Sequence, residues 1–371
     1  MANILDYLDW RGDIPFSYRP LCEIDALIFS QLSYLNLKNI VPEDFDRKGL
    51  TLREVWIKFK NSPDYKDRCN LGSQINPLTV DLLESAASSV RFGSLIVSGY
   101  MDKVDESKEE QFACLTFRGD CNWNFIAYRG TDDSFLGWKE DFNMAYEDKI
   151  PAQDDALDYL EKSVAVLRGD FYLGGHSKGG NLALYSAVKA SPKTKKRIAG
   201  VFNNDGPGFK KEFFITEDYL EIKNKVHSFV PELSIVGMLF DHAPGYSIVR
   251  SCERNMIKQH DPFGWQLKSR HFEELAERSE QSYFAASTVN GLLSELNNEE
   301  KKLFIETIFG ILKDTEVKTN QELNADLAEN MIKMLKSASK LDSKTRESVR
   351  KTIQVLFKLA WDNKDELKGK K

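Results

Sequence analysis

Residues 171–183 have the sequence Phe171-Tyr172-Leu173-Gly174-Gly175-His176-Ser177-Lys178-Gly179-Gly180-Asn181-Leu182-Ala183. The apolar beginning of this stretch predicts a short strand, its glycines predict a sharp turn, and its end predicts a helix. At its centre is a G-x-S-x-G motif, in which Gly175 and Gly179 flank Ser177. A strand that turns directly into a helix can hold such a serine in a strained conformation with an exposed hydroxyl. The stretch therefore predicts a nucleophilic serine at a strand-to-helix corner.

Glycine-rich turns before a helix also bind phosphate groups in nucleotide-binding proteins. Gly179 is followed by Gly180, however, so this stretch has neither the G-K-[ST] ending nor the G-x-G-x-x-G pattern of such turns. The unpaired N–H groups and the positive dipole end at the start of a helix instead favour an oxyanion beside Ser177. We expect the backbone N–H of Lys178 to be one donor to that oxyanion.

Strand and helix patterns alternate around this corner. Apolar runs and alternating patterns predict strands at 95–100, 112–117, 124–128, 171–174, 198–202, 225–230 and 246–250. Helical spacing of apolar residues follows at 138–146, 154–167 and from 181 onward. Strands that alternate with helices predict an α/β fold, in which a mostly parallel sheet is covered on both faces.

The patterns divide the chain into three parts. Residues 1–94 are expected to form a helical segment packed on the core, residues 95–270 the α/β core, and residues 271–371 a helical C-terminal region. The C-terminal helical patterns fall at 303–312, 323–335 and 349–361. Their apolar stripes lie beside faces that mix Lys and Glu, which is typical of plain packing, and a role as a lid or partner site stays open.

Composition excludes several classes of function. The 371 residues are 42% apolar and carry a net charge of −6, so a large core is available and non-specific nucleic-acid binding is not indicated. The five cysteines are odd in number and form no CxxC pair, which favours a reducing compartment over disulfides or a zinc site. Residues 1–10 lack the pattern of a signal peptide, and no apolar run is long enough to span a membrane. We expect a cytoplasmic protein without metal or cofactor; peripheral membrane contact and the oligomeric state stay open.

A serine nucleophile needs a base, and the chain has five histidines to provide one: His176, His227, His242, His260 and His271. His260 lies in a turn-like segment after the last predicted strand, where a loop-borne base is expected. His242 is the alternative base, and a purely structural role for both residues is the third interpretation. His176 should point away from the serine and pack.

The acid that orients the base is less well defined. Asp205 directly follows the strand after the nucleophile helix, and Gly206-Pro207-Gly208 would turn the chain tightly there. Glu232, after the next strand, is the alternative acid, and Asp205 could also hydrogen-bond only its own turn. The second oxyanion donor is expected from Thr131, because Arg129-Gly130-Thr131-Asp132 follows an earlier strand and Gly130 permits a tight approach. Capping of a helix by Thr131 or Asp132 explains these residues equally well.

Two of these stretches together resemble a known family. Ala127-Tyr128-Arg129-Gly130-Thr131, followed by Trp138 and Asp141, and the motif around Ser177 are similar to the paired signature of class 3 lipases in the α/β-hydrolase superfamily. The resemblance covers about 95–250 and implies an acylated Ser177 and a second oxyanion donor at Thr131. Residues 203–209, 234–237 and 259–263 further resemble a bacterial lipase-like family of unknown function.

The sequence departs from the class 3 lipase pattern at the acid. That family places its aspartate after the later strand in a D-x-V-P arrangement, whereas this chain has Ser234-Ile235-Val236-Gly237. The acid is then either Asp205, as in pancreatic-type lipases, or Glu232. The order Ser177, Asp205, His260 keeps the superfamily's sequence of nucleophile, acid and base.

These observations predict a serine hydrolase that cleaves a carboxylic ester, either a lipid or another acyl ester, through an acyl-enzyme on Ser177. The alternative is a non-catalytic protein that keeps the hydrolase fold and uses its C-terminal helices to bind a partner. The intact motif favours catalysis, and the serine at position 234 favours the alternative. The acyl-chain length cannot be predicted, because it depends on loop arrangement.

Overall fold

The computed structural model describes residues 2–279 apart from 46–48, 73, 133–136, 138–139, 142, 145–146, 235 and 255–257, together with residues 290, 297–299 and 301. The predicted helices at 303–312, 323–335 and 349–361 lie outside the described residues. So does Trp138 in the predicted helix 138–146. Within this range Glu140, Asp141 and Asn143 are described, and they are helical.

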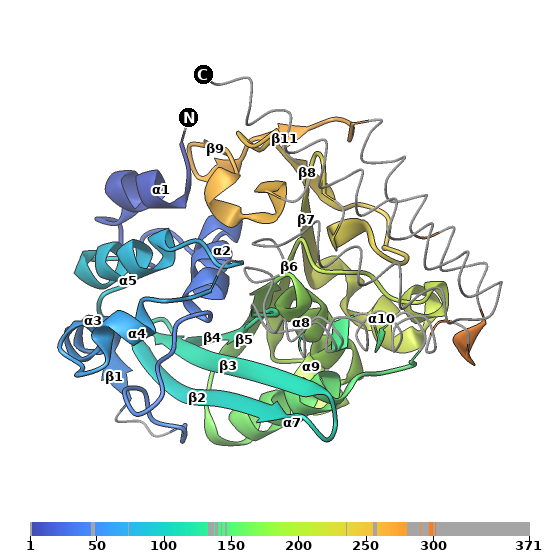
Figure 1. The fold of residues 1–371 in the computed structure, drawn as a ribbon, viewed down its shortest axis with the longest axis horizontal. Coiled ribbons are helices and arrows are strands. Elements are labelled where there is room, and N and C mark those ends of the chain that lie inside the picture. Colours follow the sequence, from blue (N-terminus) through green and yellow to red (C-terminus); the bar gives the residue numbers. More distant parts are fainter. Residues whose placement is uncertain are drawn as a thin grey trace, which may run out of the picture.

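A nine-stranded sheet forms the centre of the described structure, in the order β1-β2-β3-β4-β5-β6-β7-β8-β11 (Figure 1). Its strands are β1 (Leu50–Thr51), β2 (Ile96–Asp105), β3 (Glu110–Gly119), β4 (Trp123–Tyr128), β5 (Asp170–His176), β6 (Ile198–Asn204), β7 (Val226–Pro231), β8 (Ser247–Val249) and β11 (Glu274–Leu275). Strands β4 to β8 pair in parallel, whereas β1 to β4 and the pair β8–β11 are antiparallel. The fold is α/β with a mixed sheet, and the predicted serine corner lies in its parallel half.

The sheet extends beyond the predicted core at both ends. Strand β1 comes from the N-terminal segment, and β11 comes from the segment after 270. A second, two-stranded sheet of β9 (Leu267–Lys268) and β10 (His271–Phe272) also crosses that boundary. The first residues after 270 are therefore strands, and not the helix expected there.

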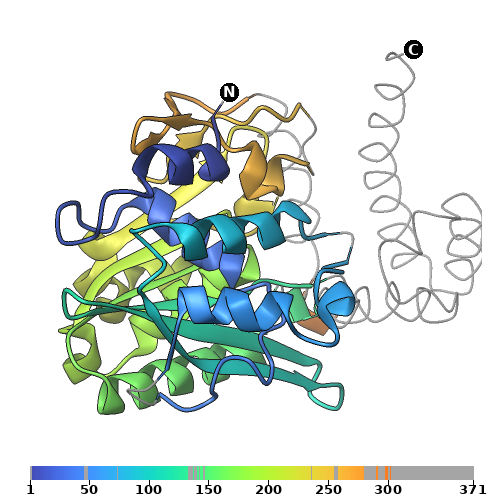
Figure 2. The same ribbon diagram turned by 90° about the vertical axis from the view of Figure 1, so that its left-hand side faces the viewer.

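Helices of the N-terminal segment pack together on one side of the sheet (Figures 1 and 2). They are α1 (Ile4–Arg11), α2 (Glu23–Leu32), α3 (Leu52–Lys60), α4 (Tyr65–Arg68) and α5 (Leu78–Ser88). Every residue of α2 except Glu23 is buried, which fits the place of this helix between the sheet and the outer helices. Helix α3 begins at a capping box, in which Thr51 and Glu54 each accept the other's backbone N–H. The N-terminal segment thus shares one hydrophobic core with the sheet.

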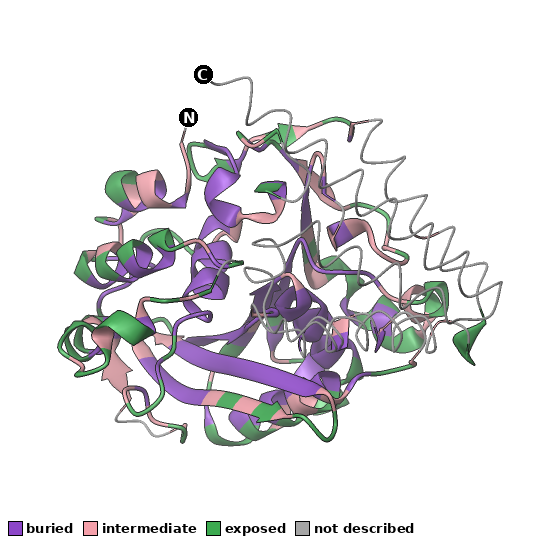
Figure 3. Cartoon of the chain, in the orientation of Figure 1, coloured by how far each residue is buried: buried purple, intermediate pink, exposed green. Residues whose placement is uncertain are grey.

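Helices α7 (Pro151–Val166) and α8 (Lys178–Lys189) cover the other face, with the short helices α9 (Pro192–Lys195) and α10 (Glu217–Ile222) beside them. Strand β4 shows how both faces are buried. Phe125 and Ala127 join the cluster of the N-terminal helices, whereas Ile126 and Tyr128 join the cluster under α7 and α8. Figure 3 shows the same for β3, which is buried along most of its length, while the end of β2 alternates with exposed residues.

The candidate site residues follow the carboxyl ends of the parallel strands. Gly130 comes soon after β4, Ser177 directly after β5, and Asp205 directly after β6. Short 3-10 turns lie at Lys211–Ile215, Lys223–Lys225, Val236–Met238, Lys258–His260 and Pro262–Gly264. Neighbouring parallel strands end at the same edge of a sheet, so these loops converge. None of the helices in the described part of the chain is long and apolar enough to cross a bilayer.

Candidate active site

Ser177 lies at the corner that the G-x-S-x-G motif predicts, between the end of β5 and the first residue of α8. Its backbone has φ +59° and ψ −134°, which is uncommon for a residue with a Cβ. A Cβ on Gly175 would lie 2.2 Å from the carbonyl carbon of Gly179, so strand and helix approach this closely only because position 175 has no side chain. Ser177 is half-buried, whereas its neighbours His176 and Lys178 are buried. Ser177 is therefore more accessible to solvent than its two neighbours at this corner.

The loop after β4 lies against this corner. A Cβ on Gly130 would be 3.0 Å from the Ser177 Cβ and 2.6 Å from the His176 carbonyl oxygen, so the approach depends on the glycine. Thr131 follows Gly130 directly, and its hydroxyl donates to Asp141 Oδ2 at 2.5 Å. Lys178 is the first residue of α8, so its N–H has no partner within the helix. The two expected oxyanion donors, Thr131 and Lys178, therefore belong to the two segments that meet at Ser177.

Asp141 is a buried carboxyl next to this loop. Burial raises the pKa of Asp141 to about 7, and this rise is opposed by the charge of Lys178 and by the hydrogen bond from Thr131. The interaction with His260 also lowers the pKa of Asp141. Near neutral pH this side chain can change protonation state while it holds the Thr131 hydroxyl.

A buried ion pair joins the nucleophile helix to the segment that carries Asp141. Lys178 Nζ lies 2.6 Å from Glu140 Oε2 and 2.9 Å from the Gln111 carbonyl oxygen, and the Lys178 and Glu140 side chains are 1% and 0% exposed. Glu140 also accepts the backbone N–H groups of Gln111 and Ala152, each at 3.2 Å. Sequence reasoning assigned Lys178 only its backbone N–H and did not single out Glu140.

Asp205 and His260 are in direct contact. His260 Nδ1 lies 2.6 Å from Asp205 Oδ2, and the side chains are 24% and 0% exposed, respectively. Because a carboxylate only accepts, Nδ1 carries the proton in this hydrogen bond. The other carboxylate oxygen of Asp205 accepts from the Ser234 hydroxyl at 2.5 Å. Asp205 has φ +53°, so this residue, like Ser177, has a positive φ directly after its strand.

His260 also lies beside the residue that precedes the serine. The ring centroids of His176 and His260 are 4.3 Å apart, and His176 Nε2 is 2.8 Å from the His260 carbonyl oxygen. The structure thus brings Asp205 and His260 together beside the corner that holds Ser177. The sequence expectation that His176 only packs missed this contact, which joins residues far apart in the chain.

The alternative site residues make other contacts. Within the described residues, no hydrogen bond or ion pair joins the Glu232 carboxylate to His260, and the Glu232 backbone pairs with Val249 and Ser279. His242 Nε2 is 3.3 Å from the Leu239 carbonyl oxygen. Burial lowers the pKa of His242 to about 4. His242 is therefore a poor base near neutral pH.

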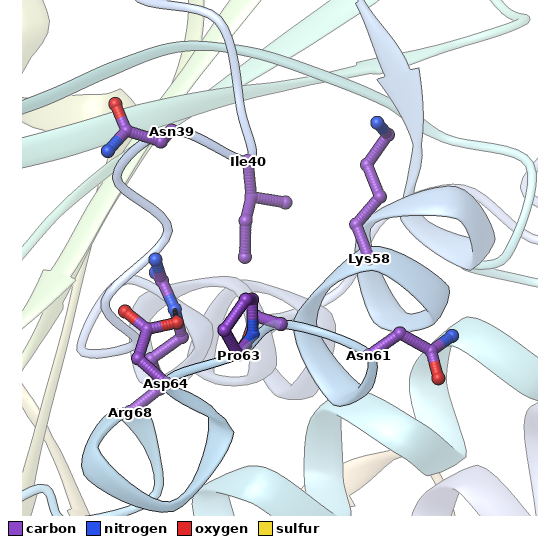
Figure 4. Close-up of a pocket in the computed structure, with 8 residues that line it drawn as sticks. Asn39, Ile40, Lys58, Asn61, Pro63, Asp64 and Arg68 are labelled. Atoms are coloured by element: carbon purple, nitrogen blue, oxygen red, sulfur yellow. Dashed lines mark hydrogen bonds and ion pairs between the residues drawn. The ribbon is translucent and has the colours of Figure 1, made fainter.

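A separate hollow of about 550 Å³ lies at α3 and α4 (Figure 4). Its lining residues are Asn39, Ile40, Lys58, Asn61, Ser62, Pro63, Asp64 and Arg68. The Arg68 guanidinium is bound by Asp64 and by the backbone carbonyls of Asn36 and Lys38. This hollow contains none of the candidate catalytic residues, and its arginine already serves to hold the local chain.

Comparison with known proteins gives distant structural similarity and one family. No curated protein sequence matches this chain significantly. Among solved structures, M37 lipase has 15% identity and a TM-score of 0.36 over 59% of this chain and 70% of its own. A Rhizomucor miehei lipase in complex with its propeptide has 16% identity and a TM-score of 0.29, over 43% of this chain and 57% of its own. A triacylglycerol lipase whose catalytic centre is a serine protease triad has 13% identity and a TM-score of 0.34, over 62% of this chain and 80% of its own.

A family model covers the core that contains all of the candidate residues. The model for Mbeg1-like proteins matches residues 86–310, which is more than half of the chain. This match confirms the expected relation to a lipase-like α/β-hydrolase family. The chain belongs to the Mbeg1-like family.

Proposed function

We propose that this protein is a serine hydrolase that cleaves a carboxylic ester, of a lipid or another acyl compound, through an acyl-enzyme on Ser177. The observation that carries the proposal is the hydrogen bond of 2.6 Å between His260 Nδ1 and Asp205 Oδ2. With the proton held on Nδ1, the lone pair of Nε2 is available to accept a proton. A histidine in this tautomer beside a strained serine is the arrangement that nucleophilic catalysis requires.

In the proposed reaction, Ser177 Oγ attacks the ester carbonyl carbon while His260 Nε2 takes the hydroxyl proton. The carbonyl oxygen becomes an oxyanion and accepts from the N–H groups of Thr131 and Lys178. The C–O bond to the alcohol then breaks, and His260 gives its proton to the leaving oxygen. Water then gives a proton to the same Nε2 and attacks the acyl carbon. The bond between this carbon and Ser177 Oγ breaks, the acid leaves, and His260 returns the proton to Ser177 Oγ. Asp205 stabilises the imidazolium that forms in each half-reaction.

Labelling with a fluorophosphonate probe tests the proposal directly, because the probe reacts only with an activated serine. Native protein should be labelled, and Ser177→Ala should not. Hydrolysis of short and long p-nitrophenyl esters by the native protein, compared with Ser177→Ala, then measures turnover and acyl-chain preference. Absence of both labelling and turnover would contradict the proposal and favour the non-catalytic alternative.

The non-catalytic alternative was motivated by the serine at position 234, where an acid was expected. Ser234 donates its hydroxyl to Asp205 at 2.5 Å, so the serine supports a carboxylate on the neighbouring strand. This contact gives Ser234 a role that is compatible with catalysis. A partner-binding role of the C-terminal region remains compatible with catalysis, because the two would use different parts of the chain.

A further inference from the structure

Three aromatic side chains form a connected series behind the candidate nucleophile. Tyr34, from the loop after α2, places its hydroxyl 3.1 Å from His176 Nδ1. His176 Nε2 lies 2.8 Å from the His260 carbonyl oxygen, and the two imidazole rings contact each other in a tilted arrangement, with centroids 4.3 Å apart and 35° between the ring planes. Tyr34 and His176 are only 6% and 5% exposed. Both nitrogens of a buried histidine are thus occupied, and one of them holds the residue expected to be the base.

The contacts define the protonation of His176. A backbone carbonyl only accepts, so His176 Nε2 must carry the proton that it donates to His260. His176 Nδ1 then has a lone pair. The Tyr34 hydroxyl lies 3.1 Å from this nitrogen and 3.3 Å from the His176 carbonyl oxygen, so both can accept its one proton. Burial raises the pKa of Tyr34, so its phenol remains a donor. Burial and the neighbouring His260 hold the pKa of His176 well below its usual range, so this ring stays neutral.

We propose that His176 is a positioning residue for His260, and that Tyr34 in turn fixes the tautomer and orientation of His176. This inference rests on the proposed function, in which His260 is the base. Asp205 holds one ring nitrogen of His260, and His176 holds its main chain and one face of its ring. Together they restrict both the backbone position and the ring rotation that decide where His260 Nε2 points.

Because His176 is neutral, its contact with the His260 ring also affects the protonation of His260. His260 becomes positively charged when it takes the serine proton, and a charged neighbour at this distance would oppose that step. A neutral ring that cannot compete for the proton avoids this repulsion. The N-terminal segment therefore contributes Tyr34 to the site, although Tyr34 lies outside the residues that the family model matches.

The hydrogen bond from His176 is one of several that position the turn Lys258–His260. Loss of this hydrogen bond should therefore slow the reaction and not abolish it. The Trp265 indole donates to the Gln259 carbonyl at 2.9 Å, and the Gln259 amide oxygen accepts the Leu233 N–H at 2.8 Å. A single hydrogen bond lost from such a set corresponds to roughly a fivefold to tenfold change in rate.

Two substitutions of His176 separate hydrogen bonding from packing. His176→Phe keeps an aromatic ring but removes both hydrogen bonds. His176→Gln loses the ring, yet its amide can donate to the His260 carbonyl and accept from Tyr34. We expect the second-order rate of fluorophosphonate labelling at Ser177 to fall roughly fivefold to tenfold in His176→Phe and by less in His176→Gln. His227→Gln, at an exposed histidine on β7, is the matched control and should label like the native protein.

A second measurement does not depend on activity. Long-range ¹H–¹⁵N spectra of the native protein should show His176 as the neutral Nε2–H tautomer across pH 5–9. Titration of His176 in this range, or the opposite tautomer, would overturn the inference. So would a His176→Phe variant that labels as fast as the native protein, or labels faster than His176→Gln. A native protein that is not labelled at all, with His176 in the expected tautomer, would instead contradict the proposed function.

Discussion

The ion pair between Lys178 and Glu140 predicts a large and strongly non-additive effect on stability. The two charged groups are 2.6 Å apart, and both side chains are essentially inaccessible. Removing one partner of a buried pair leaves the other charge uncompensated, which costs about 3–5 kcal/mol of the free energy of unfolding. An exposed pair would be worth under about 1 kcal/mol. We therefore expect Lys178→Met and Glu140→Gln each to destabilise the protein by about 3–5 kcal/mol.

The double variant should recover most of that loss. Replacing both residues removes both charges together, and the new amide at position 140 can still accept the Ala152 N–H. It can also donate to the Gln111 carbonyl, which Lys178 occupies in the native protein. One weakened backbone contact, at the Gln111 N–H, then remains and costs about 1–3 kcal/mol. The double variant should therefore be more stable than either single variant.

Urea unfolding of the native protein, both single variants and the double variant gives the four free energies of a double-mutant cycle. Lys103→Met, at a partly exposed lysine that pairs with Glu110 and Asp155, is the matched control and should cost much less than Lys178→Met. The reasoning is refuted if the single substitutions cost less than about 1 kcal/mol or if their effects add. Either result would mean that solvent reaches the pair.

Three further predictions concern the acid and the oxyanion loop. Asp205→Asn should lower kcat by as much as about 10⁴ with the fold intact, whereas Glu232→Gln should be mild; ester turnover and circular dichroism test this pair. Ser234→Ala removes a hydrogen bond to a charged group, worth about 1.5–3 kcal/mol, and should reduce both kcat and the free energy of unfolding; unchanged values would contradict the contact. The raised pKa of Asp141, about 7 against a usual 3.8, means that the folded state binds this proton more tightly than the unfolded state. The tighter proton binding by Asp141 therefore stabilises the folded state at low pH, and this stabilisation is lost as the pH rises from about 4 to about 7. The free energy of unfolding of the native protein, relative to that of Asp141→Asn, should fall over that range.

The sequence predicts the strands well, because buried strands leave apolar runs. Each of the seven predicted strands has a counterpart in the structure, from β2 to β8. The antiparallel half of the sheet was less evident, although the sequence contains a signal for it. The loops between β2, β3 and β4 are short, and a short loop can join only antiparallel neighbours, because parallel strands need a long crossover. The alternation of strands and helices farther along the chain obscured that signal.

The strands after residue 270 could not be predicted from periodicity. Strands β10 and β11 have two residues each, which is too short for an alternating pattern to appear. The apolar residues Phe272, Leu275 and Ala276 are spaced as on a helix. Their strand structure depends on partners in β9 and β8, which lie elsewhere in the fold.

Some residues of the candidate site can likewise be predicted from local sequence, and others cannot. Ser177 and the loop Gly130–Thr131 are marked by glycines that local geometry requires, so the sequence indicates both. The roles of Tyr34, His176 and Glu140 depend on contacts between residues far apart in the chain, such as the 142 positions between Tyr34 and His176. No local pattern distinguishes such residues from ordinary core side chains.

The contact between Ser234 and Asp205 gives a physical reason for the departure from the class 3 lipase pattern at position 234. Strands β6 and β7 are parallel neighbours, so the residues after them meet at one edge, and Ser234 reaches Asp205 there. The Ser234 oxygen accepts the Gly237 N–H at 3.0 Å while its own proton goes to Asp205. An aspartate at position 234 beside Asp205 would place two carboxylates within hydrogen-bond distance, and their repulsion would raise the pKa of one of them. A carboxylate after β6 and a hydroxyl after β7 are therefore compatible. The Ser234 hydroxyl can donate a hydrogen bond to Asp205, whereas an ionised aspartate at position 234 could not.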